Sequence, residues 1–289
     1  MLSSIVKVIT KRDLSYNTIV NSNTYKRYLY KKNKRKKQCY LWLCQNFSWL
    51  LKVYYKLSIR PEAATREDIL SNYSLKSNEF VVLQVGANDG FDNDPIHKFI
   101  IRDNWSGVLI EPQQQVYVNY LTKTYSKIKG IKLINAAIDN QTGEKDMYII
   151  SFSKDRWATG LASFGEESMK KLIDSGYIDK HARLQNIRTP EKKDEYIAKV
   201  KVTTYSFHDV IKNNDMNHID LLQIDAEGYD FELLKMFPFD LIKPVFLNFE
   251  FSHLNDNDKK DCYNFLSSIG YSYSKIGNDL FCELQSLNH

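Results

Sequence analysis

Three short motifs hold the residues best suited to chemistry, and each follows an apolar run. The first is Phe80-Val-Val-Leu-Gln-Val-Gly-Ala-Asn-Asp-Gly90, a strand that leads into a glycine-spaced turn. Glycine has no Cβ atom, so the backbone can turn sharply and approach a ligand with its N–H groups free to bind. Because Gly86 and Gly90 alone are also typical of an ordinary turn, this motif needs support from a second one.

The second motif is Val108-Leu-Ile-Glu111-Pro112, in which an acid ends another strand further along the chain. A carboxylate at the tip of the strand beside a glycine turn can accept hydrogen bonds from both ribose hydroxyls of an adenosine-containing ligand. A solvated carboxylate at a strand end is the plainer interpretation of Glu111, and the joint spacing argues against it. The two motifs together predict a nucleotide-type cofactor site at the carboxyl edge of a parallel sheet.

The charge of the glycine turn separates two kinds of cofactor. Pyrophosphate recognition prefers G-x-G-x-x-G at the start of a helix, whereas this turn has two glycines accompanied by Asp89, Asp92 and Asp94. Three neighbouring carboxylates repel a pyrophosphate but tolerate a cofactor that carries a sulfonium and an ammonium group. The turn therefore favours S-adenosylmethionine over a nicotinamide dinucleotide.

The third motif is Ile219-Asp-Leu-Leu-Gln-Ile-Asp-Ala-Glu-Gly-Tyr229, a buried strand that carries Asp225 and Glu227 to a turn. Residues two apart near a strand end point the same way, so both carboxylates can face a reacting centre. Burial would raise their pKa values and suit one of them to accept a hydroxyl proton. In the alternative interpretation, one acid caps the following helix and the other is solvated. Glu250 and His253, from the next strand, are further candidates for the base, although a lone histidine is more often structural.

The elements that must position these motifs alternate between short apolar runs and helical stretches. Strands are predicted at 80–85, 108–111, 131–136, 219–225 and 245–251, and helices at 94–102, 114–125, 230–236 and 256–269. This alternation is typical of a doubly wound, mainly parallel α/β sheet. A hairpin of residues 271–275 and 280–284 would close the sheet with one antiparallel strand.

The alternation is lost between Met147 and Thr204, where charged residues dominate. We expect this insertion, at about residues 151–200, to form a substrate lid. Its segment Gly160-Leu-Ala-Ser163-Phe164, with Arg156 and Trp157 before it, is the candidate for shaping the acceptor pocket.

Six segments resemble, in order, the FkbM family of methyltransferases. They are Val85-Gly-Ala-Asn-Asp-Gly90, Leu109-Ile-Glu-Pro112, Asn135-Ala-Ala-Ile-Asp139 with Thr142-Gly143, Val202-Thr-Thr204, Ile224-Asp-Ala-Glu-Gly228 and Phe249-Glu250. The similarity covers roughly residues 78–284 and does not reach the N-terminal extension. It implies a class I methyltransferase (Rossmann-like) fold, a seven-stranded sheet with an antiparallel last strand, and O-methylation of a hydroxyl group with S-adenosylmethionine.

The resemblance also implies a role for each matching residue of the cofactor site. The methionine part would be held by Gly86, Ala87, Asn88 and Gly90. The ribose would be held by Glu111, which precedes Pro112, and the adenine would lie by Ala136 and Ala137, with Asp139 nearby. Asp225 would face the methionine amine and methyl group. Gln84 departs from the pattern, because such strands often carry an acid there; its amide still accepts a hydrogen bond from an ammonium, without the charge.

The first 60 residues differ in charge from the rest of the chain. They contain 14 Lys and Arg residues against one acid, Asp13, whereas the remainder contains 26 basic and 34 acidic residues. We expect a basic, aromatic N-terminal extension at 1–60 and a methyltransferase domain at 61–289. Residues 39–56 are predicted to be helical but too often interrupted by polar residues to span a membrane.

Two interpretations of this extension compete. It is either a helix that packs on the domain behind a solvated basic linker, or a basic and aromatic element that lies on an anionic membrane. RNA binding is a third interpretation, which no recognised RNA-binding motif supports. Four cysteines without a CxxC pair argue against structural zinc, and no metal is expected elsewhere. With Lys7, Lys11, Arg12 and Asp13 interrupting any signal peptide, we expect a cytoplasmic protein with free thiols.

One leading hypothesis and two alternatives follow from the sequence. The first is an S-adenosylmethionine-dependent methyltransferase that acts on a hydroxyl of a sugar, glycan or other small metabolite. A nicotinamide-dependent oxidoreductase is supported only by the strand, the glycine turn and the acid. A catalytically inactive cofactor-binding protein, tethered to a membrane by its basic extension, is supported by Gln84 and by the charge of residues 1–60.

Overall fold

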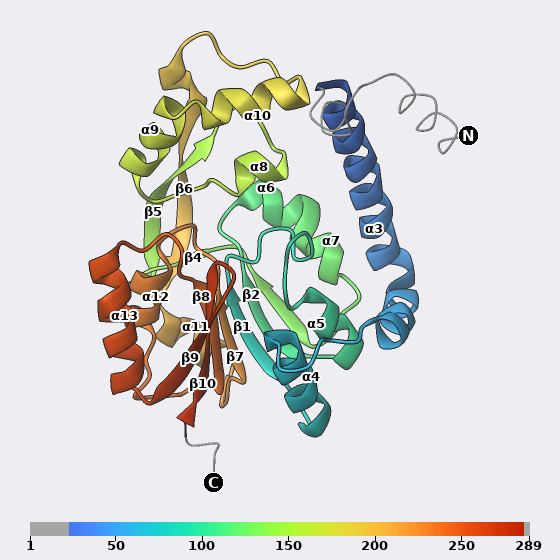
Figure 1. Cartoon of the computed structure of the whole chain (residues 1–289), viewed down its shortest axis with the longest axis vertical. Coiled ribbons are helices and arrows are strands. Elements are labelled where there is room, and N and C mark those ends of the chain that lie inside the picture. Colours follow the sequence, from blue (N-terminus) through green and yellow to red (C-terminus); the bar gives the residue numbers. More distant parts are fainter. Residues whose placement is uncertain (1–22, 286–289) are drawn as a thin grey trace, which may run out of the picture.

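The computed structural model describes residues 23–285. A seven-stranded sheet forms its centre (Figure 1). The sheet has the order β3-β2-β1-β7-β8-β10-β9. Neighbouring strands from β3 to β8 are parallel, and β10 is antiparallel to both β8 and β9. The class I methyltransferase fold and its antiparallel last strand are thereby confirmed. The strands are β1 (Val81–Val85), β2 (Ser106–Ile110), β3 (Ile131–Ile134), β7 (Leu221–Ile224), β8 (Phe246–Glu250), β9 (Tyr271–Ile276) and β10 (Asp279–Leu284).

Helices cover both faces of this sheet, which is why its central strands are apolar throughout. All five residues of β1 are buried, and alternate side chains enter alternate cores, Val82 on one face and Leu83 on the other. One core lies under α4 (Arg66–Lys76), α5 (His97–Asp103) and α7 (Thr122–Tyr125). The other lies under α11 (Phe207–Asn213), α12 (Asp230–Met236) and α13 (Asp256–Ser268).

Side-chain caps explain where several helices begin. The hydroxyl oxygen of Thr65 accepts a hydrogen bond from the Asp68 N–H at the start of α4, and Asn255 caps α13 in the same way. The predicted helix at 94–102 begins later, at His97, because the Asp94 carboxylate accepts the N–H groups of Ile96 and His97. The predicted helix at 114–125 is divided into α6 (Gln114–Val116), the π-helical turn η1 (Tyr117–Leu121) and α7.

The predicted insertion at about residues 151–200 lies between two strands of a second, smaller sheet. This sheet, in the order β4-β6-β5, contains β4 (Ala137–Ile138), β5 (Gly143–Ile150) and β6 (Ile197–Tyr205). The sequence prediction missed β5 and β6 because most of their residues are at least partly exposed, so the apolar run that marks a buried strand is lacking. Between them lie α8 (Arg156–Thr159), α9 (Glu166–Asp174), α10 (Tyr177–Gln185) and the short helix η2 (Lys193–Tyr196).

The N-terminal extension forms one long helix, α3 (Asn23–Ser58), with a kink at Phe47 (Figure 1). Residues 31–37 belong to this helix, so within the described part of the extension the solvated basic segment is helical and not a linker. Leu41, Cys44 and Leu51 are buried against the domain, whereas Cys39, the other cysteine of α3, is exposed; all four cysteines are free, as predicted. Among the described residues, no helix has the length and apolar character needed to cross a membrane.

Candidate active site

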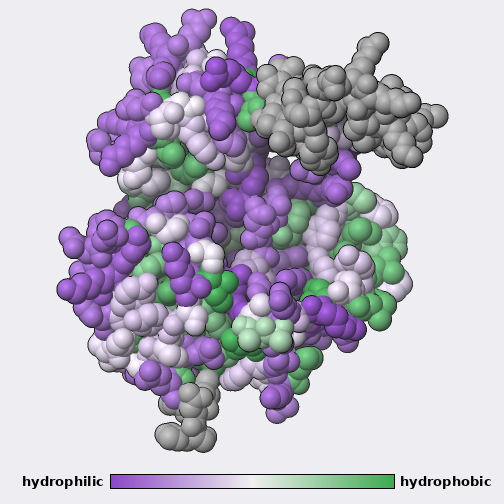
Figure 2. Space-filling model, viewed as in Figure 1, coloured by the Kyte–Doolittle hydropathy of each residue, from purple (hydrophilic) through white to green (hydrophobic). Residues whose placement is uncertain are grey.

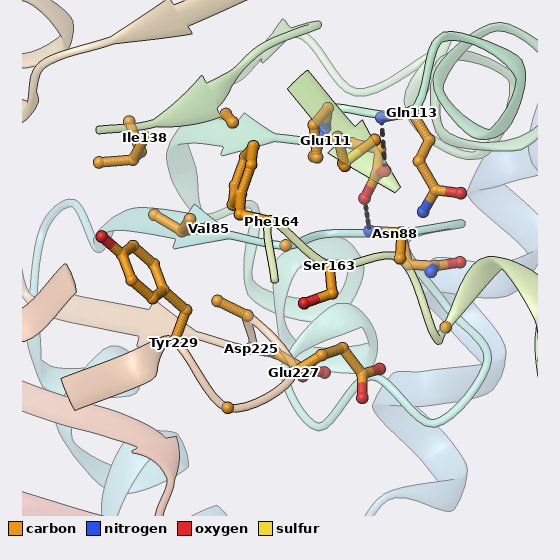
Figure 3. Close-up of a pocket in the computed structure, with 18 of the residues that line it drawn as sticks. Val85, Asn88, Glu111, Gln113, Ile138, Ser163, Phe164, Asp225, Glu227 and Tyr229 are labelled. Carbon is orange, nitrogen blue, oxygen red and sulfur yellow. Dashed lines mark hydrogen bonds between the residues drawn. The ribbon is translucent and has the colours of Figure 1, made fainter. Parts of the chain in front are cut away.

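The candidate site is a pocket of about 380 Å³ at the carboxyl ends of β1, β2 and β7 (Figure 3). Open parallel α/β sheets bind their ligands at this edge. The three motifs meet here, and the insertion forms the opposite wall. The sequence-predicted residues that line the pocket are Gly86, Asn88, Glu111, Pro112, Ala137, Asp225 and Glu227, together with Arg156, Gly160, Ser163 and Phe164 of the insertion.

The glycine turn is shaped by contacts within the protein. Gly86 has φ +80°, and a Cβ atom there would lie 1.8 Å from the carbonyl oxygen of Asp225. A Cβ atom on Gly90 would lie 2.6 Å from the Tyr125 ring. The N–H groups of Gly86 and Ala87 donate to the carbonyl of Ile110. The expectation that the N–H groups of this turn are free to bind a ligand is therefore wrong for both residues, because the turn folds back onto β2.

Glu111 is held in place by the backbone on both sides of it. Its two carboxylate oxygens accept the N–H groups of Asn88 and Gln113, each at 2.8 Å (Figure 3). The residue is 2% exposed, and burial raises its pKa to about 7 against the effect of these hydrogen bonds. A carboxylate oxygen has two acceptor positions, so each oxygen can accept one further hydrogen bond from a ligand hydroxyl.

The acids of the glycine turn do not act as we expected from their sequence positions. The Asp89 carboxylate is buried and pairs with Lys37 of α3 at 2.5 Å, while also accepting the N–H groups of Phe91 and Asp92. Asp94 accepts the N–H groups of Ile96 and His97 at the start of α5, and burial raises its pKa. These two carboxylates are satisfied internally, so they do not present the negative charge from which we argued against a pyrophosphate.

Five of the residues assigned to the cofactor by resemblance do not line the pocket. The Gln84 side chain is 3% exposed; its Nε2 atom donates to Asp94, and its Oε1 atom has no partner among the described residues. Asp139 pairs with Lys145 at 2.7 Å. The remaining three are buried and absent from the pocket lining; they are Ala87, Gly90 and Ala136.

The turn after β7 gathers carboxyl groups that lack hydrogen-bond donors. Among the described residues none donates to the carboxyl group of Asp225 or Glu227, and Glu227 has φ +51°. Burial, with a smaller contribution from Glu250, raises the pKa of Asp225 to about 6. Glu227 is exposed as a residue, but partial desolvation of its carboxyl group, followed by repulsion from Asp225, raises its pKa to about 8. Arg156, from α8, is the positive charge that opposes both shifts.

The turn itself is built by Asp230, which the sequence analysis assigned only to a helix start. Its carboxylate accepts the N–H groups of Ala226, Gly228 and Glu250 at 3.2 to 3.4 Å. Burial, followed by repulsion from Asp225, raises the pKa of this carboxyl group to about 7. Its position two residues after Gly228 was the available signal, because an acid there can fold back onto the preceding N–H groups.

Glu250 and His253 lie next to Glu227, outside the residues that line the pocket. The Nε2 atom of His253 lies 3.1 Å from Oε1 of Glu250, and the ligand atoms of all three residues lie within 4.8 Å of one another. The structure therefore brings together all the predicted candidates for the base. Two carboxylates and an imidazole in this arrangement can relay a proton or, equally, coordinate a divalent cation.

The insertion closes the pocket through its first helix and through Phe164. Gln113 Nε2 donates to the carbonyl of Thr159 at 2.8 Å, which ties the insertion to the end of β2. The Phe164 and Tyr229 rings (Figure 3) meet with their centres 6.3 Å apart in an edge-to-face arrangement. The Lys145 Nζ atom lies 4.9 Å from the centre of the Phe164 ring. Gln113 and Lys145 were not predicted, since neither belongs to a motif with a recognisable spacing. Tyr229 ends the third motif, but the sequence assigned it no role.

Comparison with known proteins identifies one matching family. A family model described as "Methyltransferase FkbM domain" matches residues 84–273, which is more than half of the chain. No curated protein matches. Similar solved structures include a precorrin-6y C5,15-methyltransferase from Geobacter metallireducens GS-15 (11% identity, 78% of this chain and 90% of that chain, TM-score 0.34). Another is the methyltransferase domain of METTL16 (10% identity, 86% of this chain and 97% of that chain, TM-score 0.37).

Proposed function

The chain belongs to the FkbM family of methyltransferases, and on this premise we propose that it transfers a methyl group from S-adenosylmethionine to a hydroxyl of a sugar, glycan or other small metabolite. Membership of the family replaces the nicotinamide-dependent oxidoreductase, whereas turnover distinguishes an active enzyme from the inactive cofactor-binding protein. The observation that carries the proposal is the pocket between Glu111 on one side and Asp225 with Glu227 on the other.

The residues of the pocket fit this cofactor in hydrogen bonding and in charge. Glu111 would accept the ribose hydroxyls with the two oxygens that the backbone holds in place. Asp225 would face the ammonium and sulfonium groups, whose positive charge would stabilise the carboxylate against the burial that raises its pKa. When bound, S-adenosylmethionine supplies an electrophilic methyl group on a positively charged sulfur.

The protein's own contribution to the chemistry is to hold the acceptor in line and to remove its proton. We assign proton removal to Glu227, which lines the pocket and has a pKa near the working pH of most enzymes. Glu250 and His253 would receive the proton from it, since their ligand atoms lie within 4.8 Å of the Glu227 carboxylate. Alignment by the pocket walls would provide most of the remaining acceleration.

The binding part of the proposal is tested by calorimetry with S-adenosylmethionine and S-adenosylhomocysteine. We expect the wild-type chain to bind both ligands and to show no heat with NADH. Glu111→Ala should abolish or strongly weaken binding, whereas Glu144→Ala, a matched change at an exposed acid of β5 outside the lining residues, should leave it unchanged. No binding of either ligand to the wild type would refute the proposal.

The acceptor class requires a separate experiment. The full chain is incubated with methyl-labelled cofactor and fractionated cell extract, and the labelled product is identified by mass spectrometry. The proposal expects the label on an oxygen of a sugar-containing or other small molecule, and Asp225→Asn as the inactive control. Label on nitrogen or carbon, or on a protein or nucleic acid, would overturn the acceptor assignment while leaving methyl transfer in place.

A further inference from the structure

The outward face of α3 carries most of the large apolar side chains that the described chain exposes to solvent. Eight of the thirteen lie on this one helix, with Leu57 73% exposed, and apolar surface follows its C-terminal half along the edge of the molecule (Figure 2). They are Tyr28, Trp42, Phe47, Trp49, Leu50, Val53, Tyr54 and Leu57. Single exposed apolar residues are ordinary, but a group of this size on one helix marks a contact surface.

Positive charge occupies the other half of the same face. Lys31, Lys32, Arg35 and Lys36 are exposed, and no described residue forms an ion pair with any of them. Arg35 and Trp42 lie seven positions apart, about two helical turns, so they project from the same side. The helix contains no acidic residue from Asn23 to Ser58. The outward face is therefore cationic toward the N-terminus and aromatic and aliphatic toward the C-terminus.

The inward face of α3 contacts the domain, so the opposite face of the helix must point to solvent. Lys37 pairs with Asp89 of the glycine turn, and the Tyr40 hydroxyl hydrogen-bonds with His97 of α5. Tyr30 donates to Asp155 of the insertion at 2.6 Å. These contacts hold the helix against the insertion and against the glycine turn with α5. The exposed side chains therefore cannot turn inward unless these contacts break.

We propose that the outward face of α3 docks on the surface of an anionic lipid bilayer. Trp42, Trp49 and Tyr54 suit the interface between headgroups and acyl chains, while the four lysines and arginines suit anionic headgroups. A protein partner fits less well, because unpaired lysines are depleted at protein interfaces. Nucleic acid also fits less well, because Leu50, Val53 and Leu57 neither stack on bases nor bind phosphates. Docking would hold the pocket at a fixed orientation to the membrane, since the same helix is bonded to the glycine turn.

The test is cosedimentation of the full chain with vesicles of phosphatidylcholine alone and of phosphatidylcholine with phosphatidylglycerol. We expect binding to the second kind only, weakened by added salt and accompanied by a blue shift of tryptophan fluorescence from Trp42 and Trp49. Equal binding to both kinds of vesicle, or binding to neither, would overturn the proposal.

Three variants separate charge, apolar contact and nonspecific effects. Neutralising the four cations to Gln should weaken binding to anionic vesicles on the order of a thousandfold, because each of the four cations contributes about 1 kcal/mol near such a surface. Trp49→Ser with Leu57→Ser should weaken it about tenfold. The matched control neutralises exposed lysines elsewhere, namely Lys76, Lys192, Lys212 and Lys260.

Each variant must bind S-adenosylhomocysteine as the wild type does, which shows that it is folded. If the control loses binding as much as the α3 variants, attraction is nonspecific and the proposal is wrong. If the Trp49 and Leu57 changes have no effect and single-stranded RNA competes with vesicles, the face binds polyanions instead. If light scattering shows a dimer that the apolar variant dissociates, the face belongs to a second copy of the chain. The last two outcomes also overturn the proposal.

Discussion

The two walls of the pocket use carboxyl groups in opposite ways. At the end of β2, both oxygens of Glu111 accept backbone N–H groups, and the side chain is locked before any ligand arrives. At the end of β7, no described residue donates a hydrogen bond to Asp225 or Glu227, and their charges repel each other. The first wall is organised to accept hydroxyl groups, and the second stores a repulsion that a positive charge would relieve.

The largest effect should come from removing the charge of the β7 wall. Asp225→Asn keeps the shape of the side chain but removes its attraction for a sulfonium. We expect kcat/KM for methyl transfer to fall on the order of a thousandfold, with the thermal midpoint changed by only a few degrees. Steady-state kinetics with labelled cofactor measures the loss. If Asp225→Asn retains a tenth of the wild-type kcat/KM, the charge of the carboxyl group at the end of β7 is not essential for methyl transfer, and the proposed difference between the two walls is wrong.

The β2 wall should respond in binding more than in chemistry. In Glu111→Gln, one carboxylate oxygen remains as an acceptor and the other is replaced by an amide NH₂ group. This NH₂ group would face one of the two backbone N–H groups that now donate to Glu111. We expect the affinity for S-adenosylhomocysteine to fall by about tenfold to thirtyfold, corresponding to one or two broken hydrogen bonds. Calorimetry gives this value directly, and kcat at saturating cofactor should change much less. A large drop in kcat with unchanged affinity would move Glu111 from binding to chemistry.

The pH dependence should separate Glu227 from its neighbours. A base must be deprotonated, and the Glu227 pKa of about 8 means that kcat should fall about tenfold for each pH unit below that value. The positive charge of the bound cofactor should lower this pKa. The fall in kcat should therefore begin at a lower pH than the fall in kcat/KM. Glu227→Gln should remove the fall in kcat. The control is the same pH profile measured in the presence of a chelator. If the fall in kcat at low pH disappears when metal ions are removed, the titrating group is a metal-bound water and not Glu227.

Much of this comparison was predictable from the sequence, because both acids end strands with recognisable patterns. The order of apolar runs predicted the parallel sheet, and Asp225, Glu227, Glu250 and His253 were expected near one centre. Their association at the end of two neighbouring parallel strands follows from sheet geometry alone. The predicted strands agree with the observed ones to within a few residues at their ends.

The parts that the sequence did not reveal depend on contacts between distant segments. Nothing in the spacing of Asp89 indicates that Lys37, far away on α3, neutralises it. The free N–H groups expected of the glycine turn are bonded instead, because Gly86 approaches the end of β7 and folds back on β2. The second sheet was missed because most residues of β5 and β6 are partly or fully exposed, so they show no buried apolar run.

The smallest effect is expected from breaking the contact between α3 and the glycine turn, which carries Asn88 next to Glu111. Lys37→Met removes the partner of Asp89, which also holds the N–H groups of Phe91 and Asp92 in the glycine turn. We expect a roughly threefold loss of affinity for S-adenosylhomocysteine, because a buried carboxylate left without its cation loosens the turn that carries Asn88. Lys36→Met, one residue away on the exposed face, is the matched control and should have no effect. If calorimetry gives the two variants equal affinity for S-adenosylhomocysteine, the glycine turn does not need its contact with α3, and α3 makes no contribution to cofactor binding.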